Sequence, residues 1–373
     1  MWCKRVNSIP AFDLTQQYRL IGEEVGAKTL EVLASGHYIN GSTVERFEQQ
    51  FASYIGVTDC IGCNSGTDAL YLALRALGIG VGDEVITTPF TFISTAGMIS
   101  AVGATPVFVD VDPQTFNLDL GKIEEAITPR TKAIIPVHLF GQPVDMTRLM
   151  AIAQSHHLWV IEDAAQAAGA DWAGAKVGSL GHIGCFSFYP TKNLGACGDA
   201  GAITTNDGAI AARIKMLRNH GQQQRYRSEA VGINSRLDAL QAAVLSIKLN
   251  YLEGWNAQRR AIAERYDQFL NHLFGITVPP ALAGHVWHQY TIQVEGGKRD
   301  DLRQKLQDQG IGSMIYYPVP LHLQPVYKYL GYLAGQLPVT ERLAQEVLSL
   351  PMFPELSQEQ QEQILYALKD SLV

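Results

Sequence analysis

Residues 158–166 read LWVIEDAAQ, an apolar run that ends in two carboxylates. Similar short apolar runs recur at 84–89, 105–111, 132–140, 184–190 and 201–206. Segments with helical spacing of apolar residues lie between them, at 69–78, after Phe92, at 122–127 and at 146–157. Strands that alternate with helices predict βαβ units, and strands apolar on both faces predict a sheet covered on both sides. We therefore expect an α/β fold with a mostly parallel, doubly wound sheet.

The sequence changes in character on either side of this alternating region. Two helical patterns precede it, at 16–35 and 44–56. The stretch 237–273 is an almost unbroken helical pattern, longer than a typical globular helix, and it predicts a bridge to a smaller domain. We expect a large domain at 1–250, including the N-terminal helices, and a small C-terminal α+β domain at 251–373 with the bridging helix.

The composition favours a globular protein. The chain has 373 residues, 47% of them hydrophobic, and a formal net charge of −7. This apolar fraction excludes general disorder, and a mildly acidic chain without a basic run is unsuited to nucleic-acid binding. No window reaches the ~18 consecutive apolar residues of a membrane helix, and the N-terminus MWCKRVNSIPAFDL has no apolar run typical of a signal peptide. We expect a cytoplasmic protein that binds neither membranes nor nucleic acids.

Five cysteines, at 3, 60, 63, 185 and 197, are too few and too scattered for a disulfide framework. Cys60 and Cys63 form a CxxC pair, which is compatible with metal or redox chemistry. No second pair or nearby histidine completes a zinc site, so we expect two buried thiols beside a strand and no bound metal.

Three strand ends carry residues that could bind a ligand or take part in catalysis. The first is CNSGTDAL (63–70), where small residues connect a strand to a helix. A helix N-terminus offers free N–H groups and the positive end of the helix dipole, which suits a phosphate. Thr67 or Asp68 as a simple helix N-cap is the alternative.

The second strand end is formed by Glu162 and Asp163, and a buried carboxylate there requires a cation or other partner. A helix cap or a structural ion pair is the alternative reading of these two residues. The third is SFYPTKNLG (187–195), in which Lys192 follows a strand and a proline turn. A lysine in a cleft beside aromatic residues can have a lowered amine pKa and attack a carbonyl, although a single lysine is commonly a solvated charge.

Together the three strand ends carry an anion cradle, an acid and a lysine on one α/β sheet. This set is what pyridoxal 5′-phosphate (PLP) requires. The lysine forms a Schiff base with the aldehyde, the acid keeps the pyridine nitrogen protonated, and the helix N-terminus holds the phosphate. The combination therefore predicts a PLP enzyme.

Ordered blocks along nearly the whole chain resemble the DegT/DnrJ/EryC1/StrS family of nucleotide-sugar aminotransferases. They include GHYINGSTVERFE (36–48), GDEVITTPFTF (82–92), GATPVFVDVDP (103–113), GINSRLDALQAA (232–243) and LSLPMFPEL (348–356), besides the three strand ends. The resemblance implies the fold type I, aspartate-aminotransferase-like architecture, PLP as cofactor, and transfer of an amino group from L-glutamate to a nucleotide-linked ketosugar by a ping-pong mechanism for amino-sugar and polysaccharide biosynthesis.

The resemblance also implies roles for individual residues around the cofactor. Lys192 is the expected catalytic lysine, and Asp163 the catalytic partner of the pyridine nitrogen. The other expected cofactor-binding residues are Gly66 and Thr67 through backbone N–H groups, Ser187 through its hydroxyl, Phe92 by stacking, Gln166 at the ring hydroxyl, and Asn234 at the phosphate of the neighbouring subunit's cofactor. The last role makes a homodimer with shared active sites necessary for function.

The substrate end is matched less closely. Tyr189 and Arg225 resemble positions that contact a nucleotide diphosphate, although an exposed loop arginine is the simpler interpretation of Arg225. The segment YYPVPLHLQP (316–325) resembles the subgroup that aminates dTDP-linked 3-keto-6-deoxy sugars at C-3. Tyr316 stands where that subgroup usually has histidine, while His322 is retained, so we expect Tyr316, Tyr317 and His322 to contact the sugar.

Three other functions fit parts of this pattern. Amination at C-4 of another nucleotide sugar uses the same machinery. The family's deoxysugar dehydratase has histidine at the position of Lys192, which argues against that reaction here. A PLP-binding regulatory protein is the third alternative, and no helix-turn-helix signal or basic face supports it.

Overall fold

The computed structural model describes residues 8–372. Its central sheet has seven strands in the order β1-β9-β8-β5-β4-β2-β3. The strands are β1 (Asp59–Cys63), β2 (Glu84–Thr87), β3 (Thr105–Phe108), β4 (Thr131–Ile135), β5 (Trp159–Asp163), β8 (Ile183–Ser187) and β9 (Gly201–Thr205). Strands β3, β2, β4, β5 and β8 run parallel, and β9 is antiparallel to both β8 and β1. The expected α/β fold with a mostly parallel sheet is confirmed.

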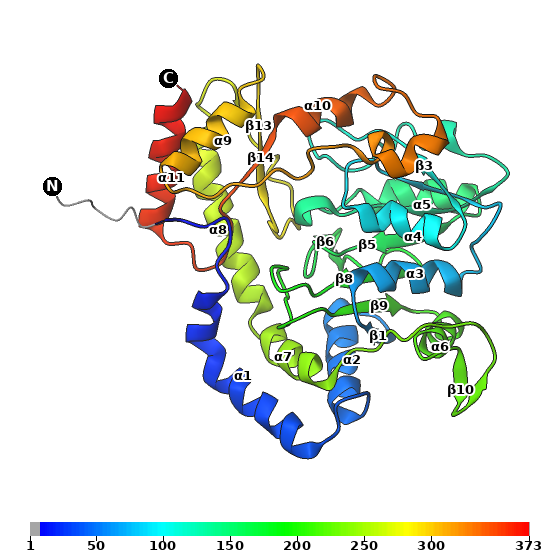
Figure 1. The fold of residues 1–373 in the computed structure, drawn as a ribbon. Helices are drawn as coiled ribbons and strands as arrows, with labels where there is room; N and C mark the ends of the chain where they lie inside the picture. The colour runs from blue at the N-terminus through cyan, green and yellow to red at the C-terminus, as the bar shows by residue number, and fades with distance from the viewer. Residues whose placement is uncertain (1–7, 373) are drawn as a thin grey trace.

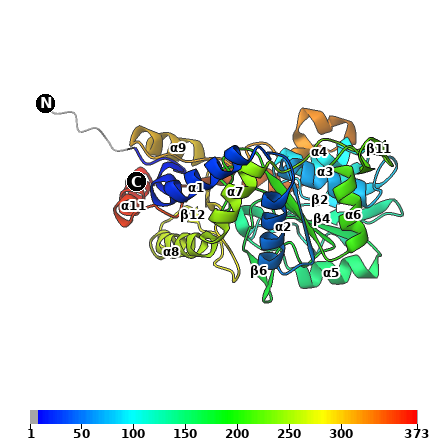
Figure 2. The ribbon, with the colours of Figure 1, turned by 90° about the horizontal axis from the view of Figure 1, so that it is seen from below.

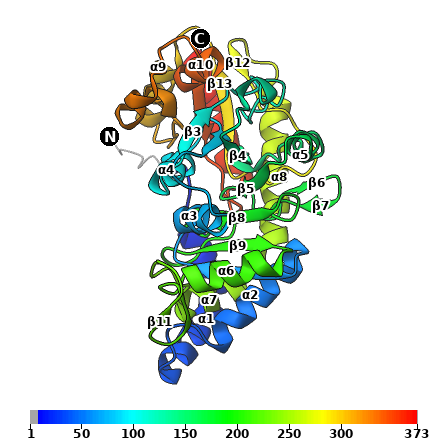
Figure 3. The same ribbon diagram turned by 90° about the vertical axis from the view of Figure 1, so that its right-hand side faces the viewer.

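Helices cover both faces of this sheet (Figures 1 and 3). One face packs against α3 (Gly66–Ala76), α4 (Ile93–Ala101) and α6 (Gly208–Leu217), and the other against α5 (Met146–Ser155), α2 (Ser42–Ile55) and α7 (Ala239–Leu249). Adjacent strand residues enter different cores: Ile161 packs under α3 and Val160 under α5. Both faces are apolar because side chains alternate across a strand and both layers must be buried.

The long helical pattern at 237–273 forms two helices, not one. Helix α7 ends at Leu249 and α8 runs from Leu252 to Leu270. Between them the N–H groups of Asn250 and Tyr251 bond to carbonyls three residues back, a tighter turn that interrupts the α-helix. The pattern of apolar residues continues through this break, which is why the sequence does not reveal it.

The C-terminal part contains a second sheet of three antiparallel strands, β12 (Ile276–Thr277), β13 (Tyr290–Val294) and β14 (Val347–Leu350). Helices α8, α9 (Arg299–Asp308) and α11 (Gln358–Leu372) pack on it (Figure 1). Ile9 also joins this core and pairs with Ile311, so the start of the described chain packs with the C-terminal part. The division at residue 250 stays a prediction.

The remaining elements are short. They are the hairpin strands β6 (Asp171–Trp172), β7 (Ala175–Lys176), β10 (Gln222–Gln224) and β11 (Arg227–Ser228), helix α10 (Pro338–Glu346), and 3-10 turns at Glu124–Ala126, Leu139–Gly141, Leu321–Leu323 and Pro325–Leu330. The helix expected at 122–127 is only a 3-10 turn. Pro129 follows it closely, and a proline disfavours helical conformation in the residue before it.

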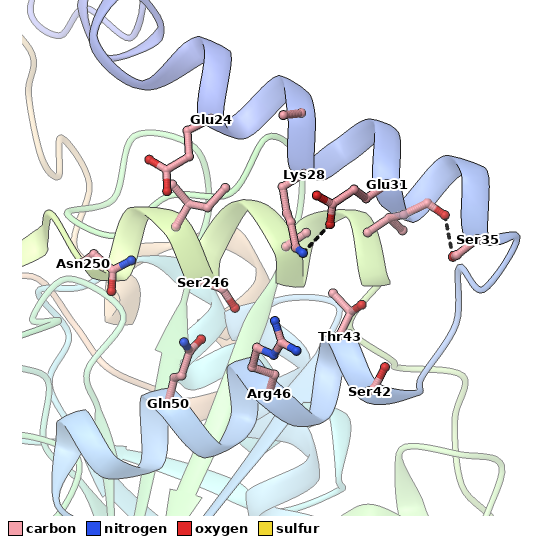
Figure 4. Close-up of a pocket in the computed structure, with 14 residues that line it drawn as sticks. Glu24, Lys28, Glu31, Ser35, Ser42, Thr43, Arg46, Gln50, Ser246 and Asn250 are labelled. Carbon is pink, nitrogen blue, oxygen red and sulfur yellow. Dashed lines mark hydrogen bonds and ion pairs between the residues drawn. The ribbon is translucent and has the colours of Figure 1, made fainter.

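Helix α1 (Thr15–Ser35) lies along the outside of the molecule and packs on α7 (Figure 2). Helices α1, α2 and α7 enclose a groove whose lining is largely polar (Figure 4). Lys28 and Glu31 of α1 form an ion pair at the groove, and Arg46 points into it from α2 (Figure 4). Helix α1 also exposes apolar side chains, among them Tyr18, Leu20 and Leu30.

Cys60 and Cys63 are both buried and free, and they pack into different cores of the sheet. Burial raises the pKa of both thiols, that of Cys63 to about 12. Cys3, and most of the segment where a secretion signal would lie, fall outside the described residues. Within residues 8–372 no helix combines the length and apolarity needed to cross a bilayer.

Candidate active site

A cavity of about 510 Å³ opens at the carboxyl ends of the parallel strands. The loops that follow β1, β2, β5 and β8 form its walls, and residues of the C-terminal part close one side. It brings together these predicted residues from distant parts of the sequence: Gly66, Thr67, Phe92, Asp163, Gln166, Ser187, Tyr189, Lys192, Tyr316 and Tyr317. This location is expected for an open α/β sheet, in which ligands bind beyond the carboxyl ends of the strands.

The N-terminus of helix α3 forms one end of the cavity. Ser65 is the N-cap, and its Oγ accepts a hydrogen bond from the N–H of Asp68 at 3.1 Å. The N–H groups of Gly66 and Thr67, the first two of the helix, have no partner within the helix and are available to an anion. A Cβ atom on Gly66 would lie 2.6 Å from Cβ of Ser187, so only glycine permits this close approach.

Asp163 lines the cavity at the end of β5. Its Oδ2 accepts a hydrogen bond from Thr95 Oγ1 at 2.8 Å, and its Oδ1 accepts one from the N–H of Ala165 at 3.2 Å. Burial raises the pKa of Asp163, while these two hydrogen bonds and the charge of Lys192 act in the opposite direction. A carboxylate at this depth suits a cationic N–H group of a ligand.

Glu162 is also fully buried but does not line the cavity. Its carboxylate accepts hydrogen bonds from the N–H groups of Gly178, Leu180 and Gly181 and pairs with His138. Of the two adjacent carboxylates, only Asp163 is therefore available to a ligand. Glu162 fits the structural alternative, because it organises the loop before β8.

Lys192 lies in a compact loop after β8. Its N–H donates to the carbonyl of Tyr189 at 2.8 Å, and a Cβ atom on Gly195 would lie 2.2 Å from the carbonyl oxygen of Pro190. Burial lowers the pKa of the Lys192 amine from 10.5 to about 8, although the charge of Asp163 opposes this shift. At pH 7 about a tenth of this lysine is therefore an unprotonated nucleophile, far more than for an ordinary lysine.

Gln166 and two aromatic residues also line the cavity. The Oε1 atom of Gln166 accepts a hydrogen bond from the N–H of Phe140 at 2.7 Å, and its Nε2 donates to the hydroxyl of Tyr317 at 3.1 Å. The rings of Phe92 and Tyr317 lie 6.4 Å apart, and Phe92 keeps an exposed face. An aromatic ligand between Lys192 and Asp163 would meet both an apolar ring and an amide.

Three predicted residues do not reach this cavity. Asn234 is exposed and forms an isolated bridge with Asn219. Arg225 lies in the exposed β10–β11 hairpin, 5.0 Å above the ring of Tyr226. His322 is buried and its Nε2 lies 3.2 Å from Glu341 Oε1.

Other residues of the site were not anticipated from the sequence. Thr95 contacts Asp163, and Ser94 Oγ lies 2.8 Å from Thr67 Oγ1. Both residues lie in the first turn of α4, just after Phe92. Two hydroxyl side chains at the start of a helix that follows a predicted strand are the sequence signal that points to them. His288 lines the cavity from the C-terminal part, and its Nδ1 bonds to Asn193 Oδ1 at 3.1 Å. No local motif marks His288, because it meets Asn193 only through the tertiary fold.

The residues present fit PLP at each of its functional groups. The free N–H groups of α3 suit a phosphate, Lys192 suits an aldehyde, and the buried carboxylate of Asp163 suits a protonated ring nitrogen. These groups lie in a single cavity although the chain brings them from positions 66, 163 and 192.

Comparison with known proteins agrees with this geometry. The model of the DegT/DnrJ/EryC1/StrS aminotransferase family matches residues 19–369. The pleiotropic regulatory protein of Geobacillus stearothermophilus is 50% identical over 96% of this chain and 97% of its own length. UDP-N-acetyl-3-dehydro-alpha-D-glucosamine 3-aminotransferase of Acidithiobacillus ferrooxidans is 47% identical, covering 98% of each chain. dTDP-3-amino-3,6-dideoxy-alpha-D-galactopyranose transaminase of Aneurinibacillus thermoaerophilus is also 47% identical, over 96% of this chain and 98% of its own.

Solved structures show the same likeness. DesV of S. venezuelae, solved in complex with a ketimine intermediate, superposes with a TM-score of 0.95 at 45% identity and covers 98% of each chain. NtdA of Bacillus subtilis, solved with bound PMP, gives a TM-score of 0.89 at 37% identity over 94% of this chain and 81% of its own. The match extends over nearly the whole chain and therefore includes every strand end that forms the cavity.

Proposed function

We propose that this chain, which belongs to the DegT/DnrJ/EryC1/StrS aminotransferase family, uses PLP to transfer the amino group of L-glutamate to the keto group of a nucleotide-linked sugar. The observation that carries the proposal is the convergence of Lys192, Asp163 and the N-terminus of α3 on one cavity. The relatives named as sugar transaminases, and the neighbour solved with PMP, support the reaction and the cofactor.

The residues of the cavity have separate roles in this reaction. Gly66 and Thr67 bind the phosphate through their N–H groups, with Ser187 beside them, and Asp163 pairs with the ring nitrogen. When bound, PLP supplies an electron sink that stabilises negative charge at the carbon bearing the amino group. Lys192 would take the proton from that carbon and deliver it to the former aldehyde carbon of the cofactor, because an amine with a pKa of about 8 exchanges protons readily near neutral pH.

The substrate side of the cavity is lined by Tyr189, Tyr316 and Tyr317. Their phenolic hydroxyls can bond to sugar hydroxyls, and their rings can pack on a pyranose. A dTDP-linked 3-keto-6-deoxyhexose is the proposed substrate, on the strength of the YPVPLHLQP segment and the dTDP-sugar relative. The relative that acts on a UDP-sugar makes UDP the principal competitor.

The proposed active unit is a homodimer with shared sites. Asn234 and Arg225 do not enter the cavity of their own chain, which is compatible with the cross-subunit roles predicted for them. The exposed apolar side chains of α1 offer a surface that a second copy can bury. A cytoplasmic location goes with this proposal, because nucleotide sugars and glutamate are both intracellular metabolites.

A substrate screen tests the function. The purified protein is incubated with PLP, L-glutamate and dTDP-, UDP- or GDP-linked 3-keto and 4-keto sugars, and the amino sugar is identified by NMR. We expect amination at C-3 of a dTDP-linked sugar. Amination at C-4, or of a UDP-sugar alone, would change the proposed substrate, and PLP binding without transfer to any ketosugar would contradict the proposed reaction.

A further inference from the structure

Thr95 is fixed by its contacts as a donor to Asp163. The two residues are 1% and 5% exposed, and the distance from Thr95 Oγ1 to Asp163 Oδ2 is 2.8 Å. An ionised carboxylate can only accept hydrogen bonds, so the single proton of the Thr95 hydroxyl must point to Oδ2. A bond between a hydroxyl and a carboxylate is among the stronger hydrogen bonds in a buried site.

Thr91 extends this arrangement by one residue. Its Oγ1 lies 3.1 Å from Thr95 Oγ1, and it is 3% exposed. Because Thr95 has already used its proton on Asp163, Thr91 must be the donor in this second contact. The two hydroxyls therefore form a directed chain that ends at Oδ2, and each bond strengthens the other.

The hydroxyl of Thr95 helps to orient the carboxylate of Asp163. Oδ2 accepts the bond from Thr95 at 2.8 Å, and Oδ1 accepts the longer bond from Ala165 at 3.2 Å. An ionised carboxylate oxygen can accept two hydrogen bonds, so each oxygen keeps one acceptor site for a ligand, while the two existing bonds fix the orientation of the carboxylate. Without Thr95 the carboxyl group could rotate and lose this orientation.

The other ionisable groups around Asp163 cannot replace this hydroxyl. Lys192 and His138 face the carboxylate from the loops after β8 and β4, Cys185 faces it from β8, and Tyr317 from the C-terminal part. Cys185 and Tyr317 add no positive charge when neutral, and the charge of Lys192 is lost near pH 8. The bond from Thr95 stays the same at every pH at which Asp163 is ionised.

We propose that Thr95 is a positioning residue for the cofactor, which orients the Asp163 carboxylate and keeps it ionised so that it can accept the ring N–H of PLP. This inference rests on the proposed use of PLP. Removing the hydroxyl makes the ionised carboxylate less stable in its buried position. Asp163 then takes up a proton at a higher pH, and a protonated carboxyl cannot stabilise the protonated ring nitrogen.

Release of PLP from the full-length holoprotein tests this role. The release rate is measured between pH 5.5 and 8.5 by dilution into a PLP-trapping protein, for the parent, Thr95→Val, Thr95→Ser and Thr91→Val. Thr87→Val is the matched control, because Thr87 is a fully buried threonine of β2 whose hydroxyl bonds to the carbonyl of Ile135 and which does not line the cavity.

We expect Thr95→Val to release PLP about ten-fold faster or more at the acidic end, with the difference shrinking as pH rises, since one charge-assisted hydrogen bond is lost. Thr95→Ser retains the donor and stays near the parent, while Thr91→Val shows a smaller effect in the same direction. Equal release from Thr95→Val and the parent at every pH, or equal acceleration in the valine and serine variants, would overturn the inference. Should Thr95→Val not fold, the pH dependence of Thr91→Val decides, and a flat profile overturns it. Failure of the parent itself to hold PLP would instead contradict the proposed function.

Discussion

Glu162 and His138 form a fully buried pair, with 3.1 Å between Glu162 Oε2 and His138 Nε2. The N–H of Val144 donates to Nδ1 of the same ring at 3.0 Å, so the proton of the neutral imidazole lies on Nε2 and points to Glu162. Glu162 and Asp163 are neighbours in β5. The carboxylate of Glu162 is fully hydrogen-bonded within the protein, whereas that of Asp163 lines the cavity. This separation assigns different roles to two carboxylates that look equivalent in the sequence.

Replacing each carboxylate by its amide tests this assignment. Asp163→Asn removes the anion at the ring nitrogen and should lower kcat by at least ~100-fold, the usual size of such an electrostatic contribution. Glu162→Gln places an N–H group against the N–H donors of the loop at 178–181, so that donors face each other, and should lower the free energy of unfolding by about 1–3 kcal/mol. The kcat of the folded protein should stay within a few-fold of the parent. Steady-state kinetics and urea unfolding measure both. The opposite ranking of the two kcat values would exchange the roles.

The pKa of Lys192 predicts how fast PLP is taken up. Burial disfavours the ammonium form, so below pH 8 most of the side chain is protonated and cannot attack the aldehyde. The rate of PLP incorporation into protein freed of cofactor should rise through about pH 8 and then level off, followed by the visible absorbance of the bound cofactor. A rate that keeps rising toward pH 10.5, the ordinary pKa of lysine, would show that the amine is not perturbed.

Gly66 predicts a steric effect at the phosphate end. Gly66→Ala places a Cβ atom 2.6 Å from Cβ of Ser187, which should displace the start of α3 or the end of β8 and weaken PLP binding by ~10-fold or more. Gly97→Ala is the control, because its Cβ would have no neighbour within 4 Å and α4 is helical there. Fluorescence titration with PLP gives both affinities. Equal PLP affinities of the two variants would contradict the prediction that Gly66 lies at the phosphate site.

Mixed dimers test whether two chains share each active site. Lys192→Ala and Asn234→Ala are each expected to be impaired as homodimers. In a mixed dimer both defects fall in one site if Asn234 acts on the partner's cofactor, which leaves the other site intact. Mixing should therefore restore up to about half of the parental activity per mixed dimer. No recovery, in a mixture shown by mass spectrometry to contain mixed dimers, would contradict the shared site.

Arg225 is predicted to act on the sugar substrate alone. Arg225→Ala should raise KM for the nucleotide sugar by removing a charge-assisted contact to the diphosphate, and leave the half-reaction with glutamate nearly unchanged. The two half-reactions are measured separately by single-turnover absorbance. Equal impairment of both would place Arg225 outside the nucleotide-binding region.

The sequence was sufficient for the fold and for much of the site because the decisive residues lie next to strong local patterns. Asp163 ends a continuous apolar strand, Lys192 follows another, and Gly66 begins a helix, so their position at one sheet edge follows from the topology. The residue pattern alone does not separate Glu162 from Asp163, and only the family resemblance singles out Asp163. The hydrogen-bond partners of Glu162, which are His138 and the loop at 178–181, are distant in the chain.

Residues that act through tertiary contacts were beyond the reach of the sequence. The hydrogen bond between Thr95 and Asp163 joins positions 68 residues apart, and that between His288 and Asn193 joins positions 95 apart. His322 was expected at the sugar, but the structure buries it against Glu341 at the start of α10, outside the cavity. A histidine in a proline-rich loop gives no local signal of which of these two environments it occupies.

Mapping the covalent attachment of PLP tests most directly whether Lys192 is the catalytic lysine of a PLP enzyme. The purified holoprotein is reduced with borohydride, digested and analysed by peptide mass spectrometry. We expect the added mass of the reduced cofactor on the peptide that contains Lys192, and its loss in Lys192→Ala. Attachment to Lys248, the buried lysine of α7, or to no lysine at all would contradict it.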